Sequence, residues 1–354
     1  MKYLIINLFF TLLFISCFIK IYNKNIKMQC FTKSISDYFI AQKYNHTHCL
    51  KNELILNIFD SNNFKNYKYC IKNLELCKTN QIFKGLQIVS PESTLDEIIK
   101  NKKSISRFGD GEFGLINGIS ISFQKANKLL SKKLKNVLTS NEDGLLIGLP
   151  NSLKIEFLDK LIENSKIFWF NFIKRSKFLL TLLNKNKIYY SSFISRFYLF
   201  YKDKSGVSNY IKKLKKIWEK KDILIVEGEK TRLGIGNGLF NNTNSIKRII
   251  CPAINAFKLY DKIFNETLKM EKKKLILLAI GPTSTVLAYD LYKAGYQVID
   301  IGHVDIEYEW YLKNATTKIK IEGKYVNEAN DGKTDIIEIN DKEYFEQIIS
   351  KVLN

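Results

Sequence analysis

The pattern of the chain changes at about residue 86, where apolar runs begin to alternate with amphipathic segments. Short apolar runs are typical of buried strands, and apolar residues spaced three and four apart are typical of helices. The runs predict strands at 104–108, 144–149, 222–226, 248–251, 275–280 and 297–301. The amphipathic stretches predict helices at 125–139, 155–164, 207–220, 257–270 and 284–294. This alternation indicates an α/β domain with a doubly wound, largely parallel sheet.

The first residues form an apolar stretch of a different kind. No Asp, Glu, Lys or Arg occurs between residues 3 and 19, which predicts a membrane anchor over residues 1–24. An uncleaved anchor is favoured over a signal peptide because no small residues mark a cut site after Ile19. Residues 25–85 show no sustained period and are interpreted as a stem, so that one domain would span 86–354. We therefore expect a single-pass membrane protein.

Two features of the predicted anchor and stem disagree about its orientation. Lysines follow the apolar stretch, which argues weakly against placing the domain outside the cytoplasm. Cys30, Cys49, Cys70 and Cys77 would suit two disulfides in an oxidising compartment. On the cysteines we expect a lumenal domain, in the Golgi or endoplasmic reticulum if the cell is eukaryotic. A bacterial inner membrane is the alternative.

The charge balance favours anionic partners. Lys and Arg number 56 against 35 Asp and Glu, a formal charge of +21. Such a field suits nucleotides, phosphoglycans, nucleic acid or an acidic membrane face, although general Lys and Asn enrichment explains it equally well. Nucleic acid is disfavoured because the lysines of 212–221 lack interleaved aromatic residues and fit a solvated helix face.

The loops that follow predicted strands are where ligands bind in an open α/β sheet. In the first of them, Asp110 and Glu112 flank Gly111 and follow Gly109. Carboxylate oxygens on a tight glycine backbone can meet a hard cation such as Mg²⁺ or Mn²⁺. A plain turn is the alternative interpretation of this segment. Arg107, two residues before Gly109, could help to stabilise negative charge on a ligand at this loop.

Two further loops carry features of phosphate binding. In the loop at 227–238, Gly234 and Gly236 permit close backbone approach, and Arg232 could bind a phosphate. In the next, Gly281, Thr283 and Ser284 join a strand to a helix whose macrodipole favours an anion. A flexible loop and a simple helix cap are the respective alternatives.

The last strand is followed by His303, Asp305 and Glu307. His303 is the only histidine after residue 85, which argues against a Ser/His/Asp hydrolase and against a multi-histidine metal site. Asp305 or Glu307 could act as the general base toward an acceptor hydroxyl. A solvated helix start is the alternative interpretation of this acidic run.

Three segments together resemble the glycosyltransferases of the GT-D fold, namely 104–124 (SISRFGDGEFGLINGISISFQ), 226–257 (VEGEKTRLGIGNGLF through CPAINAF) and 280–310 (IGPTSTVLAYDLYKAGYQVIDIGHVDIEYEW). The resemblance extends from about residue 86 to the end. It implies a Rossmann-like glycosyltransferase that takes a nucleotide diphosphate sugar, a UDP-sugar above others, and holds Mn²⁺ or Mg²⁺ through an Asp-x-Glu motif. Asp110 and Glu112 stand at the two motif positions.

The expected activity is transfer of a sugar, such as a hexose, to a glycan or glycoprotein acceptor. Asp305 and Glu307 join the two motif carboxylates as catalytic candidates. Loop position alone suggests the donor-binding residues, which are Arg107, Gly109, Gly111, Arg232, Gly234, Gly236, Gly281, Thr283, Ser284 and His303. The rival functions are a membrane-tethered glycan- or phosphate-binding protein without turnover and a metal-dependent phosphoester hydrolase.

Overall fold

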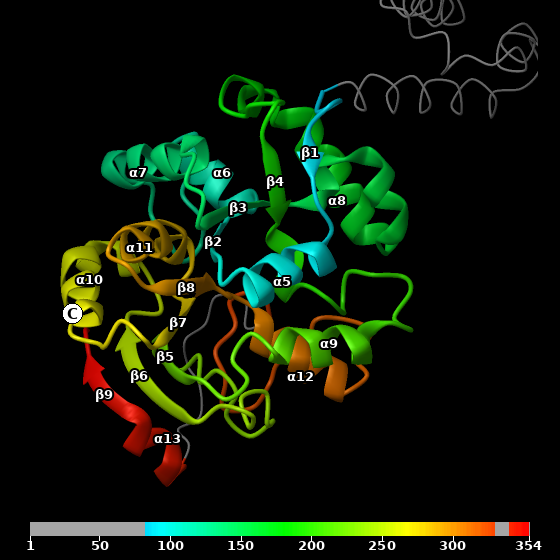
Figure 1. Ribbon diagram of the computed structural model, residues 1–354. Helices are drawn as coiled ribbons and strands as arrows, with labels where there is room; N and C mark the ends of the chain where they lie inside the picture. The colour runs from blue at the N-terminus through cyan, green and yellow to red at the C-terminus, as the bar shows by residue number, and fades with distance from the viewer. Residues whose placement is uncertain (1–81, 330–339, 354) are drawn as a thin grey trace, which may run out of the picture. The chain divides into compact units, whose positions relative to one another are not determined.

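A computed structural model describes residues 82–329 and 340–353, and every structural statement below concerns these residues. Their centre is a nine-stranded sheet in the order β1-β4-β3-β2-β8-β7-β5-β6-β9 (Figure 1). All neighbouring strands pair in parallel. The strands are β1 (Gln87–Ile88), β2 (Ser104–Arg107), β3 (Leu145–Leu149), β4 (Ile188–Ser191), β5 (Asp222–Gly228), β6 (Ser245–Cys251), β7 (Leu275–Ala279), β8 (Gln297–Asp300) and β9 (Ile348–Lys351).

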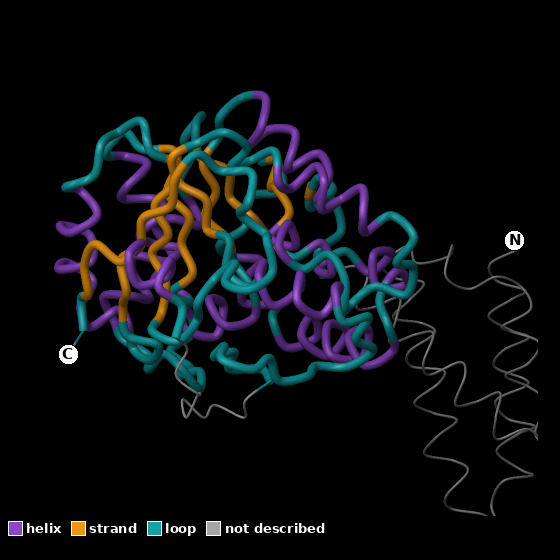
Figure 2. Tube along the Cα trace, turned by 90° about the horizontal axis from the view of Figure 1, so that it is seen from below, coloured by secondary structure: helices purple, strands orange, loops and turns teal. Residues whose placement is uncertain are grey.

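Helices cover both faces of this sheet, as the view from below also indicates (Figure 2). The α-helices are α5 (Pro91–Lys100), α6 (Asp110–Ile116), α7 (Lys128–Thr139), α8 (Glu163–Arg175), α9 (Val207–Lys215), α10 (Tyr260–Leu268), α11 (Pro282–Lys293), α12 (Val304–Leu312) and α13 (Lys342–Gln347). The short 3₁₀ helices are η2 (Asn151–Leu153), η3 (Ile155–Lys160), η4 (Lys177–Thr181), η5 (Ser192–Ser195) and η6 (Ala256–Leu259).

Alternate residues of the strands supply two separate cores, because successive side chains of a strand point to opposite faces. In β5, Leu224 and Val226 pack in the cluster that contains the buried faces of α7, α10 and α11. Ile223 and Ile225 pack in the cluster that contains those of α5, α9 and α12. This two-sided burial explains why the central strands are almost wholly apolar.

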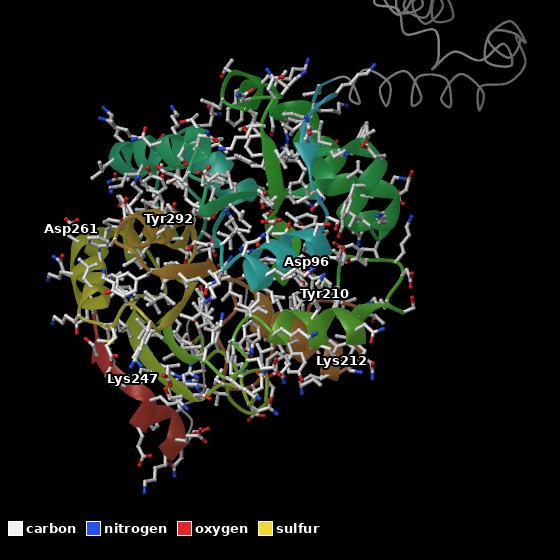
Figure 3. The ribbon with its side chains drawn as sticks, in the orientation of Figure 1. Asp96, Tyr210, Lys212, Lys247, Asp261 and Tyr292 are labelled. Carbon is white, nitrogen blue, oxygen red and sulfur yellow. The ribbon has the colours of Figure 1, made fainter. Side chains whose placement is uncertain are left out.

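Polar contacts at the surface join neighbouring helices within a layer. Asp96 of α5 accepts a hydrogen bond from Lys213 of α9 at 2.6 Å. Figure 3 labels Asp96 and, on α9, Tyr210 and Lys212, so the approach of these two helices can be followed there. The basic flank of α9 is therefore in part paired with α5.

The direction of winding changes between β2 and β8. From β2 the chain steps through β3 to β4 on one side, whereas β7 and β8 approach β2 from the other side. The helices that follow also separate, since the buried residues of α6 belong to one core and those of α12 to the other. In doubly wound sheets, ligands bind at the carboxyl ends of the strands at such a switch point.

The expected parallel α/β sheet is confirmed. All six predicted strands are present, and β1, β4 and β9 were missed. The helix predicted at 155–164 is wrong, because η3 ends at Lys160 and α8 begins at Glu163. The backbone N–H of Ile162 bonds to the carbonyl oxygen of Phe200 at 2.9 Å, and this contact interrupts the helical pattern.

The expected localisation, a single-pass membrane protein with a lumenal domain, is corrected. Within residues 82–329 and 340–353 no helix has both the length and the apolar character needed to cross a bilayer. The predicted anchor (1–24), its cysteine-containing stem up to residue 81 and the four stem cysteines lie outside the described residues.

Candidate functional site

Asp110 and Glu112 lie at the start of α6, directly beyond the carboxyl end of β2. Glu112 Oε2 accepts a hydrogen bond from the Gly109 N–H at 2.7 Å, which closes the first turn of the helix. The Asp110 side chain faces solvent and forms no salt bridge within the described residues. One carboxylate is thus fixed by its helix, and the other remains available to a ligand.

Negative charge gathers around these two side chains. Burial, together with the nearby carboxylates of Asp300 and Asp110, raises the pKa of Glu112 to about 7. Although Asp110 is open to solvent, the protein atoms around it remove part of its hydration and raise its pKa; the charge of Glu328 raises this pKa further, and that of Arg196 opposes the rise. A bound cation would relieve this repulsion.

Arg107, the last residue of β2, is committed to holding the switch point together. Its Nη2 donates to Asp300 Oδ1 at 2.9 Å and its Nε to the Asp300 carbonyl oxygen at 2.6 Å. Its Nη1 donates to the Ser195 hydroxyl at 2.8 Å and to the Ser192 carbonyl oxygen at 3.0 Å. The guanidinium therefore joins β2 to β8 and to η5. These bonds favour a structural role for Arg107 over the donor-binding role expected from the sequence.

The turn after β8 is shaped around this arginine. Gly302 adopts φ +43°, and a Cβ at that position would lie 2.1 Å from Arg107 Nη2. Only glycine provides both the left-handed backbone and the empty space. Gly302 thus lets the turn that carries His303 cross directly over the Arg107 guanidinium.

Beyond that turn, three basic side chains surround the carboxylate of Glu328. His303 Nε2 lies 3.2 Å from Glu328 Oε1, and Lys318 Nζ lies 2.7 Å from Oε2. Arg196 contacts both oxygens, with Nη1 at 3.4 Å from Oε2 and Nη2 bonded to Oε1. Burial and the neighbouring Arg196 lower the pKa of His303. This cluster of Arg196, His303, Lys318 and Glu328 is called the Glu328 cluster below.

The chain's own groups cover the start of α11 and supply hydrogen bonds there. Gly281 is the N-cap at φ +60°, and the Ser284 hydroxyl accepts a hydrogen bond from the Ile280 N–H at 2.8 Å. A Cβ on Gly281 would lie 2.8 Å from a ring carbon of Phe123, so the loop after α6 covers this turn. Thr283 is buried, and its hydroxyl has no hydrogen-bond partner in the described part of the chain. The geometry favours the helix-cap interpretation for Ser284.

Comparison with known proteins agrees with this architecture. Residues 105–329 match the family "Glycosyltransferase GT-D fold". "Glycosyltransferase GlyD" of Streptococcus pneumoniae is 39% identical over 271 residues, which are 76% of this chain and 33% of that protein. "Probable glycosyl transferase Gly" of Streptococcus gordonii is 34% identical over 296 residues, which are 83% of this chain and 43% of that protein.

A solved structure makes the same assignment in three dimensions. It is described as "The highly conserved domain of unknown function 1792 has a distinct glycosyltransferase fold", and it superposes with a TM-score of 0.74 at 40% identity. The match covers 79% of this chain and 100% of the solved one. This chain belongs to the GT-D glycosyltransferase family. It spans well under half the length of the two curated relatives.

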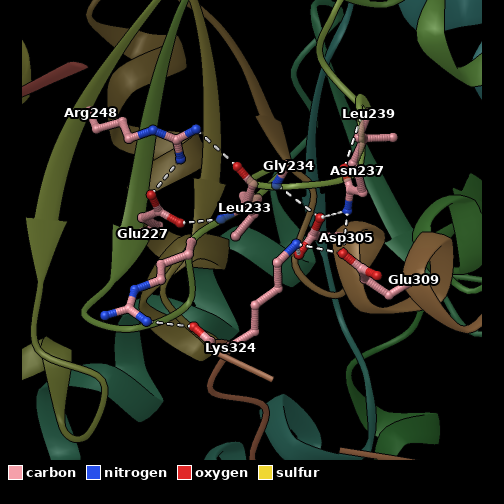
Figure 4. A network of polar contacts seen from close by, with 11 residues as sticks. Glu227, Leu233, Gly234, Asn237, Leu239, Arg248, Asp305, Glu309 and Lys324 are labelled. Atoms are coloured by element: carbon pink, nitrogen blue, oxygen red, sulfur yellow. Dashed lines mark hydrogen bonds and ion pairs between the residues drawn. The ribbon is translucent and has the colours of Figure 1, made fainter. Parts of the chain in front are cut away.

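Two residues of the GT-D domain that were expected to be catalytic lie inside it instead. Asp305 Oδ1 accepts hydrogen bonds from the Gly234 N–H at 2.8 Å and from Asn237 Nδ2 at 2.6 Å, as Figure 4 shows. Its Oδ2 accepts from Lys324 Nζ at 2.8 Å. Glu307 is fully buried, and its Oε2 accepts from the backbone N–H groups of Tyr198 and Leu199 at 3.0 Å. Both carboxylates are buried and bonded within the chain, which favours a structural role for Asp305 and Glu307 over the acceptor-base role expected from the sequence.

Arg232 is also internal, contrary to the donor-binding role expected of it. The side chain is 3% exposed, and its Nη1 donates to the Gly323 carbonyl oxygen at 2.7 Å. Gly234, at φ +75°, has no space for a side chain because a Cβ would lie 2.3 Å from Phe240 Cδ2. Gly236 shares that φ but has open space around it. This loop therefore packs onto α12. The positive φ angles of its glycines let the backbone turn there.

The motif carboxylates suit the divalent cation that the GT-D resemblance implies. Asp110 faces solvent, and the Oε1 atom of Glu112 lies outside the Gly109 hydrogen bond. Oxygen donors of this kind are what Mg²⁺ and Mn²⁺ prefer. Within the described ranges no group of three or more His, Cys, Asp or Glu side chains could hold a metal. Phosphate oxygens of a donor and water are oxygen ligands of the same kind and could complete the coordination.

Sequence reasoning missed Asp300, Arg196 and Glu328. Asp300 lies within the predicted strand 297–301 and is the last residue of β8, a position from which an acidic side chain reaches the switch point. Arg196 follows β4, a strand too short to leave an apolar run. Glu328 lies in a loop without periodicity, so no sequence signal placed it beside His303.

Proposed function

We propose that this chain transfers a hexosyl group from a nucleotide diphosphate sugar, foremost a UDP-sugar, to a glycan or glycoprotein acceptor in a metal-dependent reaction. The observation that carries the proposal is the Asp110 and Glu112 pair at the start of α6, at the switch point of a GT-D sheet. The names of the two streptococcal relatives support the reaction class.

The chain's own residues fit the demands of this reaction. Asp110 would bind the cation from the solvent side, and Glu112 would bind it from a position fixed by the Gly109 N–H. A divalent cation held there would neutralise the charge that grows on the departing diphosphate. Arg107 would act through Asp300, whose carboxylate it positions below the same turn. We assign no acceptor base.

The binding-protein and hydrolase alternatives are less well supported. A protein that only binds glycans would not need both motif carboxylates at the strand end. A phosphoester hydrolase commonly uses more metal ligands, and the described residues offer no cluster of three.

The proposal is tested by measuring nucleotide release from UDP-, GDP- and CDP-sugars with Mn²⁺, each with and without a panel of glycan acceptors. We expect release of UDP that requires an acceptor and stops on addition of a chelator. Release that is equal with and without acceptor would instead support a hydrolase. No release and no binding of any nucleotide would contradict the transferase.

A further inference from the structure

Glu328 has more hydrogen-bond donors and basic side chains around it than one carboxylate needs. Arg196, His303 and Lys318 all approach it, and they come from three different parts of the chain. Although burial would raise the pKa of Glu328, Arg196 and His303 hold it far below its ordinary value. The carboxylate is therefore ionised, and it fills a site built from converging donors.

The Glu328 cluster adjoins the proposed metal site. Gly302, the residue before His303, packs against Arg107, where an added Cβ would lie 2.1 Å from Nη2, and Arg107 ends β2 three positions before Asp110. The charges of Arg196, Lys318 and Glu328 also act on the Asp110 carboxylate. The Phe200 ring lies under the two cations, 5.1 Å from the Arg196 guanidinium carbon and 5.9 Å from Lys318 Nζ. A phosphate group bound to a cation at Asp110 would therefore lie beside the Glu328 cluster.

Arg196 is held in place independently of Glu328. Its Nη1 lies 3.7 Å from Glu307 Oε1, the buried oxygen that has no hydrogen-bond partner among the described residues. Glu307 is itself fixed by two backbone N–H groups. If Glu328 moved away, the Arg196 guanidinium would therefore keep its orientation but lose one of its two anionic partners.

The segment that carries Glu328 is anchored just before it. The Tyr325 N–H donates to the Lys230 carbonyl oxygen at 2.7 Å, and Lys324 bonds to Asp305 and Glu309 at 2.8 Å. The Glu328 side chain is 22% exposed, so solvent and ligands can reach it. It can move away without loss of the buried anchor.

We propose that Arg196, His303 and Lys318 form a phosphate subsite, and that Glu328 occupies this subsite as an internal anion until the donor's diphosphate displaces it. The inference rests on the proposed function for the identity of the ligand. A carboxylate and a phosphate offer a guanidinium the same bidentate geometry, so one can replace the other. The diphosphate carries more charge than Glu328, which favours the exchange.

The test is calorimetric titration of the full chain with inorganic pyrophosphate in the presence of a chelator. Glu328→Gln removes the competing charge and keeps the shape, so we expect pyrophosphate to bind about fivefold or more tightly than it binds wild type. Glu322→Gln is the matched control, because Glu322 is an exposed carboxylate of the same segment. It should leave the affinity unchanged.

An unchanged or weaker affinity in Glu328→Gln would overturn the proposal, since it would make Glu328 a structural contact or a ligand contact rather than a competitor. Lys318→Met provides a second test that does not depend on a buried change, because the Lys318 side chain is 42% exposed. It should weaken pyrophosphate binding about threefold or more. Unchanged binding in this variant would also overturn the subsite.

A second titration, with UDP and Mn²⁺, separates this proposal from the proposed function. Glu328→Gln should bind UDP more tightly by a similar factor. If no variant binds UDP while pyrophosphate behaves as expected, the phosphate subsite is supported and the UDP-sugar transferase is contradicted. If wild type binds UDP with Mn²⁺ and Glu328→Gln gains nothing with either ligand, the subsite is overturned and the transferase proposal survives.

Discussion

Two sets of carboxylates lie at or beyond the carboxyl ends of β2, β5 and β8, and their surroundings are opposite in kind. Asp305 and Glu309 are 6% and 10% exposed and share Lys324, while Glu227 is bonded to Arg248 at 2.6 Å (Figure 4). Asp110, by contrast, faces solvent without a salt bridge in the described residues. Acidic residues that look alike in the sequence therefore form buried ion pairs in one set, whereas in the other set Asp110 stays open to the cation that we propose.

This difference in burial and pairing indicates which carboxylates are available to a ligand. A buried charge requires a partner and stays with it, because water cannot replace the partner. An exposed carboxylate at a helix start that is surrounded by further negative charge gains most from a ligand cation. Substitutions should thus affect folding in the first set and binding in the second.

The largest expected effect is on stability, from Lys324→Met. This substitution leaves the buried Asp305 and Glu309 without their shared cation, so the free energy of unfolding should fall by about 3–5 kcal/mol. Denaturant unfolding of the full chain measures it. Lys320→Met, at an exposed lysine of the same segment, is the control and should change little. Equal free energies of unfolding for the two variants would contradict the claim that the buried carboxylates depend on Lys324 for stability.

A smaller loss is expected from Gly302→Ala. The new Cβ would meet Arg107 Nη2 in a backbone conformation that alanine resists, at a cost of about 2 kcal/mol. Because Arg107 positions Asp300 beside the motif carboxylates, metal-dependent UDP binding should weaken as well. Gly206→Ala, with no atom within 4 Å of the added Cβ, is the control. Unaltered unfolding in Gly302→Ala would contradict the close packing of this turn.

The pH dependence of Mn²⁺ binding should sharpen the comparison further. Since the pKa of Glu112 is raised to about 7, its proton must leave before a cation can bind. Affinity should fall by up to about tenfold per pH unit below 7 and level off above it. The metal-free chain should lose stability relative to Glu112→Gln as pH rises from 4.5 toward 7, because the unfolded chain releases this proton first. A flat profile from pH 5 to 8 would contradict the shifted pKa.

The sequence predicted the fold well wherever strands were buried on both faces. Apolar runs such as those of β5 and β7 are typical of central strands that are buried on both faces. Because helices alternate with these runs, the sequence predicted a parallel sheet. The edge strands β1 and β9 and the strand β4 beside β1 were missed, because each has only two to four residues and is in part exposed. Local patterns thus located the centre of the sheet and not its edges.

The position of the candidate site residues was predictable where they follow a strand end, and it was not predictable where their partners come from distant segments. Asp110 and Glu112 directly follow β2, so the strand itself places them. Arg232 looked like a phosphate ligand because nothing local revealed that residue 323 would accept its hydrogen bond. Asp305 was misjudged for the same reason, since Lys324 reaches it only in the folded chain.

The central claim is that Asp110 and Glu112 bind a cation together with a nucleotide. The direct measurement is calorimetric titration of the full chain with UDP in Mn²⁺ and again in chelator, for wild type, Asp110→Asn and Asp261→Asn. Asp261 is likewise an exposed aspartate in the first turn of a helix, α10, and is labelled in Figure 3, but it does not lie at the switch point.

The account predicts metal-dependent UDP binding by wild type and Asp261→Asn, and a loss of about a hundredfold or more in Asp110→Asn with little change in the thermal unfolding midpoint. Full UDP affinity of Asp110→Asn in Mn²⁺, or equal affinity of wild type with and without chelator, would contradict it.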